Sequence, residues 1–144
     1  MTQNIDGMHQ HAGADKVIEL HGSLWRLRCQ YHGAQEDSGI HYKTRICSLC
    51  HAWLRPDIVW FEDVLDLTIL QRVESLMNIA DLFVAIGTSG HVYPAAVFPV
   101  LAKQAGAKIV CINTEIPPDE NIFEHVCLGK AGAVLEKLFS HYIR

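Results

Sequence analysis

Three cysteines and a histidine in one polar stretch have the spacing of a metal site. Cys47 and Cys50 form a Cys-x-x-Cys pair, and a tight turn at this spacing can bring both thiolates onto one tetrahedral ion. Cys29 supplies a third thiolate, and His32 follows it at the matching Cys-x-x-His spacing. Zinc prefers such a set of sulfur and nitrogen ligands. The sequence therefore predicts a structural zinc site formed by Cys29, His32, Cys47 and Cys50.

The other cysteines and histidines leave alternatives open. His41 and His51 are weaker candidates for the fourth ligand. The alternative to a metal site is a degenerate module in which the thiols of Cys29, Cys47 and Cys50 bind nothing. Cys111 and Cys127 lie within apolar runs, where cysteine usually behaves as a small buried hydrophobe. An odd number of cysteines, five, and an N-terminus without the features of a secretion signal favour metal binding over disulfides.

Polar triplets follow two apolar runs in the second half of the chain. Gly87-Thr88-Ser89 comes directly after the run 81–86, and Asn113-Thr114-Glu115 comes after the run 108–112. Backbone N–H groups and hydroxyls at a strand end suit phosphate oxygens, and an acid just beyond a strand suits ribose hydroxyls. Such turns also simply cap helices. Together the two triplets favour a nucleotide-binding site.

His21 has the position of a general base. It follows Val17-Ile18-Glu19-Leu20 and precedes Gly22-Ser23, which places it at the end of a short expected strand, in a tight turn. A histidine titrates near neutral pH and can move a proton there. The chain has nine histidines, and most are expected to be ordinary surface or packing residues, so a packing role for His21 is the alternative.

Apolar runs alternate with helical patterns in the second half. Short runs predict strands over 81–87, 108–112 and 125–128, and the apolar spacing predicts helices over 69–77 and 134–142. A further helix is expected over 95–105, with Gly106 as its C-cap and with a start or a kink at Pro99. This order of elements predicts an α/β fold with a mostly parallel sheet.

The first half shows less regular patterning. Residues 16–20 are expected to form a short strand, followed by a polar turn at 21–23. From Arg28 to Ala52 there is little hydrophobic periodicity, so this stretch needs another source of stability, such as a bound metal ion.

Composition excludes several classes of partner. A net charge of −4 and a pI near 6.1 give no support for nucleic-acid binding. No apolar stretch has the length needed to cross a bilayer. We therefore expect a soluble, cytoplasmic protein that binds neither nucleic acid nor membrane.

These motifs occur in an order that resembles the sirtuin (Sir2) family of NAD-dependent protein-lysine deacylases. The resemblance covers the whole chain. The matching segments are Thr2-Gln3-Asn4-Ile5-Asp6-Gly7, Glu19-Leu20-His21-Gly22-Ser23-Leu24, Arg28-Cys29, Cys47-x-x-Cys50, Leu54-Arg55-Pro56-Asp57-Ile58-Val59-Trp60-Phe61, Gly87-Thr88-Ser89, Asn113-Thr114-Glu115 and Gly129-Lys130-Ala131-Gly132.

The resemblance implies a fold and a reaction. Sirtuins join a Rossmann-like NAD-binding domain to a small zinc-binding module, and an acyl-lysine peptide enters the cleft between them. Residues 1–26 and 54–144 would then belong to the NAD-binding domain, and residues 27–53 to the zinc module. The products would be deacylated lysine, nicotinamide and O-acyl-ADP-ribose.

The resemblance also implies a role for each matching residue. His21 matches the base that deprotonates a ribose hydroxyl after nicotinamide has left, and Asn4 and Asp6 match catalytic positions of the nicotinamide-ribose pocket. The positions that match cofactor contacts are Gln3, Asn4, Ile5, Asp6, Gly87, Thr88, Ser89, Asn113, Thr114, Glu115 and Ala131. Val59, Trp60 and Phe61 match the strand that pairs with the substrate backbone. Cys29, Cys47 and Cys50 match zinc ligands, and His32 stands where many members have a cysteine.

The segment 87–96 resembles the class III branch, which includes bacterial deacylases and mitochondrial desuccinylases. In that branch an upstream Tyr and Arg select negatively charged acyl groups. Neither is present in this sequence, so the acyl preference stays open.

The sequence also departs from the family. The Gly-Ala-Gly loop that holds the NAD pyrophosphate and the first strand of the sheet precede Gln3 in family members and are not in this sequence. We therefore expect this chain to be inactive or barely active alone, and to expose a sheet edge at Leu82–Ile86 that can pair with another chain. Glu62 replaces a family glycine beside the substrate strand. Two alternatives are a non-catalytic binding module and a protein mono-ADP-ribosyltransferase.

Overall fold

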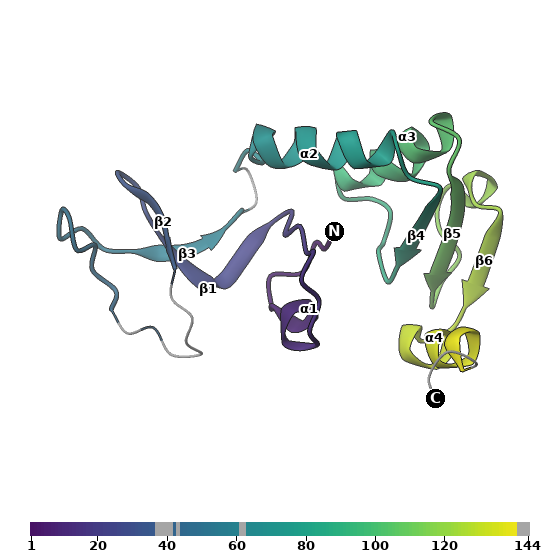
Figure 1. Ribbon diagram of the computed structural model, residues 1–144, viewed down its shortest axis with the longest axis horizontal. Coiled ribbons are helices and arrows are strands. Elements are labelled where there is room, and N and C mark those ends of the chain that lie inside the picture. The colour runs from purple at the N-terminus through teal and green to yellow at the C-terminus, as the bar shows by residue number, and fades with distance from the viewer. Residues whose placement is uncertain (37–41, 43, 61–62, 141–144) are drawn as a thin grey trace. The chain divides into compact units, whose positions relative to one another are not determined.

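A computed structural model describes residues 1–36, 42, 44–60 and 63–140 (Figure 1). The chain divides into two compact units, Met1–Gln71 and Arg72–Arg144. The boundary between them falls within the helix α2 (Leu67–Met77), which buries Val73 and Met77. Among the described residues, no helix has both the length and the apolar character that crossing a membrane requires.

The first unit is built on a three-stranded antiparallel sheet with the order β2-β1-β3. Its central strand β1 (Gly22–Cys29) pairs with β2 (Gly33–Glu36) on one side and with β3 (Arg55–Ile58) on the other. A short helix α1 (Met8–His11) precedes β1. The buried side chains Leu20, Leu27, Cys29 and Cys47 form the core of this unit.

One expectation for this unit was wrong, and another was wrong in part. The run 16–20 is not a strand, because it contributes only one isolated bridge, between Thr2 and Glu19. The expected turn at 21–23 holds only at His21, because residues 22 and 23 already belong to β1, which extends to Cys29. The alternation of apolar Trp25, Leu27 and Cys29 with Arg26 and Arg28 is a strand pattern with a period of two, and it explains this outcome.

β1 starts at Gly22, where the backbone accepts glycine alone. Gly22 has a φ of +79°, and a Cβ added there would lie 2.0 Å from the main-chain oxygen of Asp57 in β3. Residues with a side chain avoid this φ. The two strands can therefore approach this closely only because position 22 has no side chain, and this contact lies directly beside His21.

Gly22→Ala is expected to lower the free energy of unfolding by about 3 kcal/mol, the sum of backbone strain and overpacking. Gly13→Ala is the matched control, because Gly13 has a φ of +87° but nothing within 4 Å of an added Cβ. In the control, only the backbone strain should lower the free energy of unfolding, by about 1 kcal/mol. Urea unfolding of both variants measures the difference, and equal losses would contradict the steric argument.

The second unit contains a parallel sheet with the order β4-β5-β6 (Figure 1). Its strands are β4 (Leu82–Ile86), β5 (Lys108–Asn113) and β6 (His125–Leu128), paired in parallel. Between β4 and β5 lie a 3-10 turn, η1 (Ala95–Val97), and α3 (Phe98–Gln104); η2 (Glu120–Ile122) precedes β6, and α4 (Ala131–Phe139) follows it. This confirms the predicted α/β order and parallel sheet.

The core of the second unit lies where α3 packs on β4 and β5. The buried side chains there include Ala85, Phe98, Ala102 and Ile109. Pro99 occupies the first turn of α3, where a missing N–H is tolerated. Gly106, with a φ of +99°, ends this helical segment as expected.

Candidate functional site

The four predicted metal ligands converge at one end of the antiparallel sheet. Cys29 ends β1, His32 lies in the turn to β2, and Cys47 and Cys50 lie in a separate turn. Cys29 Sγ lies 3.6 Å from both His32 Nδ1 and Cys50 Sγ, and Cys47 Sγ lies 3.5 Å from His32 Nδ1. All four ligand atoms lie within 4.8 Å of one another.

This geometry fits zinc. Ligand atoms about 2.3 Å from a tetrahedral ion are about 3.8 Å apart, close to the separations seen here. The chemistry of the ligands also fits, because zinc binds the thiolate form of cysteine. The backbone N–H groups of Cys50 and Leu49 lower the pKa of the Cys47 thiol to about 6. The N–H of Tyr31 and the ring of His32 lower the pKa of Cys29. The first unit thus contains a site that can hold a zinc ion through Cys29, His32, Cys47 and Cys50.

Backbone hydrogen bonds shape the turn that presents Cys47 and Cys50. The Cys47 N–H donates to Ala52 O at 2.9 Å, and the His51 N–H donates to Cys47 O at 2.9 Å. His51 itself has a φ of +58° and is not part of the cluster. His41, the other alternative ligand, lies outside the described residues.

His21 lies between the N-terminal segment and β3. Its Nδ1 lies 3.0 Å from the main-chain oxygen of Gln3, and its own main-chain oxygen accepts a hydrogen bond from the Val59 N–H at 3.0 Å. Because a carbonyl oxygen can only accept, Nδ1 carries the proton in this contact. The neutral ring then keeps a lone pair on Nε2, which is the atom that can act as a base.

The polar segment Gln3–Asp6 is held against the start of β1. The Trp25 indole N–H donates to Asp6 O at 2.7 Å, and the Leu24 N–H donates to Ile5 O at 3.0 Å. The Asp6 carboxylate accepts the Met8 N–H at 3.0 Å and so starts α1. Asn4 is exposed. These contacts fix the segment beside His21.

The polar triplets of the second unit meet at the carboxyl end of its parallel sheet. Gly87-Thr88-Ser89 follows β4, and Asn113-Thr114-Glu115 begins at the end of β5. The Asn113 side-chain amide donates to Thr88 O at 3.1 Å, and the Gly129 N–H donates to Asn113 O at 2.8 Å. Ala131 begins α4, and two residues separate it from the end of β6. In open α/β sheets this edge is where ligands bind.

The predicted substrate strand continues β3. Val59 is half-buried and is tied to His21 by the hydrogen bond from its N–H. The Trp60 side chain is exposed, and the Trp60 N–H donates to the Asp63 carboxylate at 3.2 Å. Phe61, and the substituted position Glu62, lie outside the described residues.

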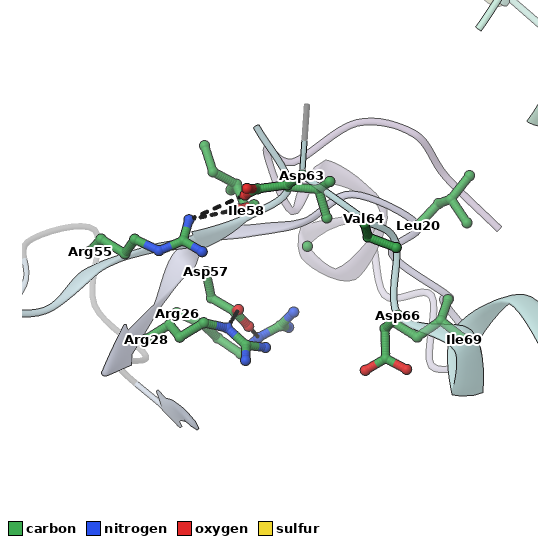
Figure 2. Close-up of a pocket in the computed structure, with 12 residues that line it drawn as sticks. Leu20, Arg26, Arg28, Arg55, Asp57, Ile58, Asp63, Val64, Asp66 and Ile69 are labelled. Carbon is green, nitrogen blue, oxygen red and sulfur yellow. Dashed lines mark hydrogen bonds and ion pairs between the residues drawn. The ribbon is translucent and has the colours of Figure 1, made fainter. Parts of the chain in front are cut away.

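An ion-pair network that the sequence reasoning missed joins β1 to β3. Arg26 Nε and Arg28 Nε bind the two carboxylate oxygens of Asp57 at 3.1 and 2.5 Å. Arg26 Nη1 also binds Glu19 at 2.5 Å, two residues before His21. Arg26, Arg28 and Asp57, which Figure 2 shows, line a cavity of about 370 Å³. The alternation of arginines with apolar residues over 25–29 was the signal that could have revealed this charged face.

Asp57→Asn is expected to destabilise the chain by about 2 kcal/mol at neutral pH, because two charged hydrogen bonds are weakened in a site where the side chain is 11% exposed. Burial alone would raise the pKa of Asp57, but the bonds from Arg28 and Arg26 outweigh it and hold the pKa below its ordinary value of 3.8. The stabilisation is therefore complete above this ordinary value and is lost as the pH falls through the lower, folded-state pKa.

Urea unfolding at a series of pH values checks this prediction, with Asp15→Asn, an exposed position, as control. The difference in the free energy of unfolding between the native chain and Asp57→Asn should disappear in acid. A difference that stays constant down to the lowest pH at which the chain still folds would contradict the prediction.

Comparison with known proteins identifies the family. The polar strand ends of a parallel sheet and a cluster that can hold a metal ion define an α/β protein of the Rossmann-like type with a small metal-binding module. The sequence model of the Sir2 family matches residues 1–94, and the chain belongs to this family, the sirtuins. It is 42% identical over 140 residues to NAD-dependent protein deacylase 2 of Pyrobaculum aerophilum, and 40% identical over 147 residues to the NAD-dependent protein deacylase of Aquifex aeolicus.

These relatives are longer than the chain. The two alignments cover 96% and 98% of the chain but 56% and 60% of the relatives. Among solved structures, a Sir2 homologue–NAD complex has a TM-score of 0.88 and 38% identity, over 97% of this chain and 56% of that one. A Sir2–p53 peptide–NAD⁺ structure has a TM-score of 0.84 and 29% identity, over 98% and 61%. The chain thus has the sirtuin fold over rather more than half the length of its relatives.

Proposed function

We propose that the chain is the part of an NAD-dependent protein-lysine deacylase that carries the general base, the substrate strand and the adenosine side of the cofactor site. Family membership and the names of the relatives support the reaction class. The observation that carries the proposal is the placement of His21. Its ring contacts the segment Gln3–Asp6, and its backbone contacts the substrate strand at Val59.

His21 is proposed to move one proton. With Nδ1–H donated to Gln3 O, the Nε2 lone pair can accept the proton of a ribose hydroxyl. When bound, NAD would supply the ADP-ribosyl group that accepts the acyl chain, with release of nicotinamide. Asn4 and Asp6 are proposed to line the nicotinamide-ribose pocket, together with Gln3 and Ile5.

The second unit is proposed to bind the adenosine part of NAD. The main-chain N–H groups and hydroxyls of Gly87-Thr88-Ser89 offer donors to phosphate or ribose oxygens. Glu115 offers a carboxylate to ribose hydroxyls, beside Asn113 and Thr114, and Ala131 contacts the adenine. Support comes from the convergence of these positions at one sheet edge, which the Asn113–Thr88 hydrogen bond holds together.

Val59, Trp60 and Phe61 are proposed to pair with the backbone of an acyl-lysine peptide. In the sheet order β2-β1-β3, β3 is an outer strand among those described, and an outer strand can accept a peptide as an additional strand. The Sir2–p53 peptide–NAD⁺ structure, to which this chain is similar, supports a peptide substrate. Deacetylation or desuccinylation, with the preference between them left open, a cytoplasmic location, and a domain division into 1–26 with 54–144 and 27–53 belong to the same proposal.

A chimera tests the reaction class. This chain would replace the matching segment of the Pyrobaculum aerophilum relative, and the product would be incubated with NAD and acetyl-lysine or succinyl-lysine peptide. We expect NAD-dependent loss of the acyl group with formation of O-acyl-ADP-ribose. Transfer of ADP-ribose from labelled NAD to protein, without deacylation, would favour a mono-ADP-ribosyltransferase. Peptide binding with neither reaction would favour a binding module.

The outer edge of β4 is proposed to pair with another chain. β4 is an outer strand of the described parallel sheet, and its side chains Leu82, Val84 and Ile86 are 56%, 40% and 44% exposed. Unpaired backbone groups beside exposed apolar side chains favour strand addition. Val84→Lys is therefore expected to reduce self-association in sedimentation velocity. Ile116→Lys, at an exposed loop position, should leave it unchanged, and equal effects of both substitutions would contradict the proposal.

A further inference from the structure

The charged face of the β1–β3 pair brings three arginines together, Arg26, Arg28 and Arg55. Arg28 lies directly opposite Arg55 in the strand register, and Arg26 lies on the same face as Arg28. Like charges directly opposite each other destabilise a sheet. Local arrangements of this kind concentrate at functional sites. Asp57 and Asp63 offset this repulsion, but the apposition of Arg28 and Arg55 makes the face a candidate for a further function.

The arginines offer hydrogen-bond donors that the chain itself does not use. Among the described residues, Arg28 uses only its Nε, toward Asp57. Arg55 uses only Nη1, toward Ile58 O at 3.3 Å and Asp63 at 3.7 Å. A guanidinium has several N–H donors in a planar fork that matches a carboxylate or a phosphate. The Arg28 and Arg55 side chains are 43% and 47% exposed, so a ligand can reach these donors.

The three acids that line the same cavity each accept at least one hydrogen bond within the chain. Asp57 binds both Arg26 and Arg28. Asp63 accepts the Trp60 N–H, and Asp66 accepts the Thr68 N–H at 2.7 Å, at the start of α2. In the cavity, carboxylates that already accept hydrogen bonds lie beside arginine N–H groups that donate none to the described residues. A ligand with its own acceptor oxygens could bind these arginine N–H groups.

The cavity adjoins the proposed substrate strand. Its lining includes Ile58 and Val59, together with the arginines (Figure 2). A peptide paired with Val59 and Trp60 would direct alternate side chains toward and away from the sheet face that carries the arginines. We propose that this cavity is a subsite for an anionic side chain, a carboxylate or a phosphate, close in sequence to the acyl-lysine of the substrate. The inference rests on the proposed function, because it presupposes an acyl-lysine peptide on this strand.

Fluorescence polarisation with labelled peptides tests the subsite on the intact chain. A neutral acetyl-lysine peptide would carry a single Glu at each flanking position in turn, and matched peptides would carry Gln or phosphoserine there. At one position Glu should bind about tenfold more tightly than Gln, a difference of about 1.4 kcal/mol. The phosphoserine arm shows whether the subsite prefers a phosphate to a carboxylate.

Variants assign the effect to the cavity. Arg55→Gln should remove the preference for Glu over Gln, and Arg55→Lys, which keeps the charge but not the fork, should restore only part of it. Arg45→Gln removes an exposed arginine outside the cavity and should change nothing. Thermal unfolding of each variant verifies its fold. Since Arg55 is half-exposed and its pair with Asp63 is long, Arg55→Gln should fold normally.

The outcomes separate the inference from the proposed function. Acetyl-lysine peptides that bind equally well with Glu and with Gln at every position would overturn the inference alone. A preference for Glu that survives Arg55→Gln would also overturn it. If no peptide binds more tightly when its lysine is acetylated, the proposed function fails and the inference fails with it.

Discussion

Removal of zinc is expected to unfold the segment 29–53 of the chain. Cys29, His32, Cys47 and Cys50 bring this segment together, and Cys29 and Cys47 are the only buried side chains among its described residues. Zinc binding by such sites contributes on the order of 10 kcal/mol to the folding of small modules. We expect one zinc per purified chain, and we expect a strong chelator to make the bond after Arg45 sensitive to trypsin.

Ligand substitutions make this prediction specific. Cys47→Ser should release the metal, because Cys47 is fully buried and no other described side chain can replace its thiolate. His32→Cys should keep the metal, since a set of four thiolates also binds zinc. Cys127→Ser, in β6, is the control and should keep it as well. Folded protein with a zinc content near zero, and a tryptic pattern that the chelator leaves unchanged, would contradict the metal site.

His21→Ala is expected to lower deacylation by the chimera about 100-fold to 10,000-fold, the usual range for loss of a general base. The Gln3 carbonyl holds Nδ1, so the proposed base function would reside on Nε2. The substitution should leave the fold intact, because Leu20 and Gly22 on either side provide the buried packing and the close strand contact. His9→Ala, on the exposed face of α1, is the matched control and should retain full activity.

The parallel sheet and the metal ligands could be predicted from the sequence because their signals are local. Apolar runs marked β4, β5 and β6 within a residue of their observed bounds. The Cys-x-x-Cys and Cys-x-x-His spacings each fix two ligands within one turn of chain. The start of α3 at Phe98 is one of the two outcomes, a start or a kink, that Pro99 predicted for the helix expected over 95–105.

The antiparallel sheet and its charged face could not be predicted in the same way. The pairing of β1 with β3 joins residues about thirty positions apart, such as Arg26 and Asp57, and the β1–β3 register is broken by a bulge between Ser23 and Leu27. Neither feature leaves a local pattern. A turn was predicted at His21-Gly22-Ser23 because glycine is common in turns. Gly22 instead allows β1 to approach Asp57 closely.

The most direct test of the central claim compares two reactions in the same chimera. His21 is proposed to carry out a proton transfer that follows the departure of nicotinamide. His21→Ala should therefore still exchange labelled nicotinamide into NAD in the presence of acetyl-lysine peptide, while O-acyl-ADP-ribose formation falls by at least about 100-fold. Retention of full product formation would show that His21 is not the base. Equal loss of exchange and product formation would show that it acts before, and not after, nicotinamide leaves.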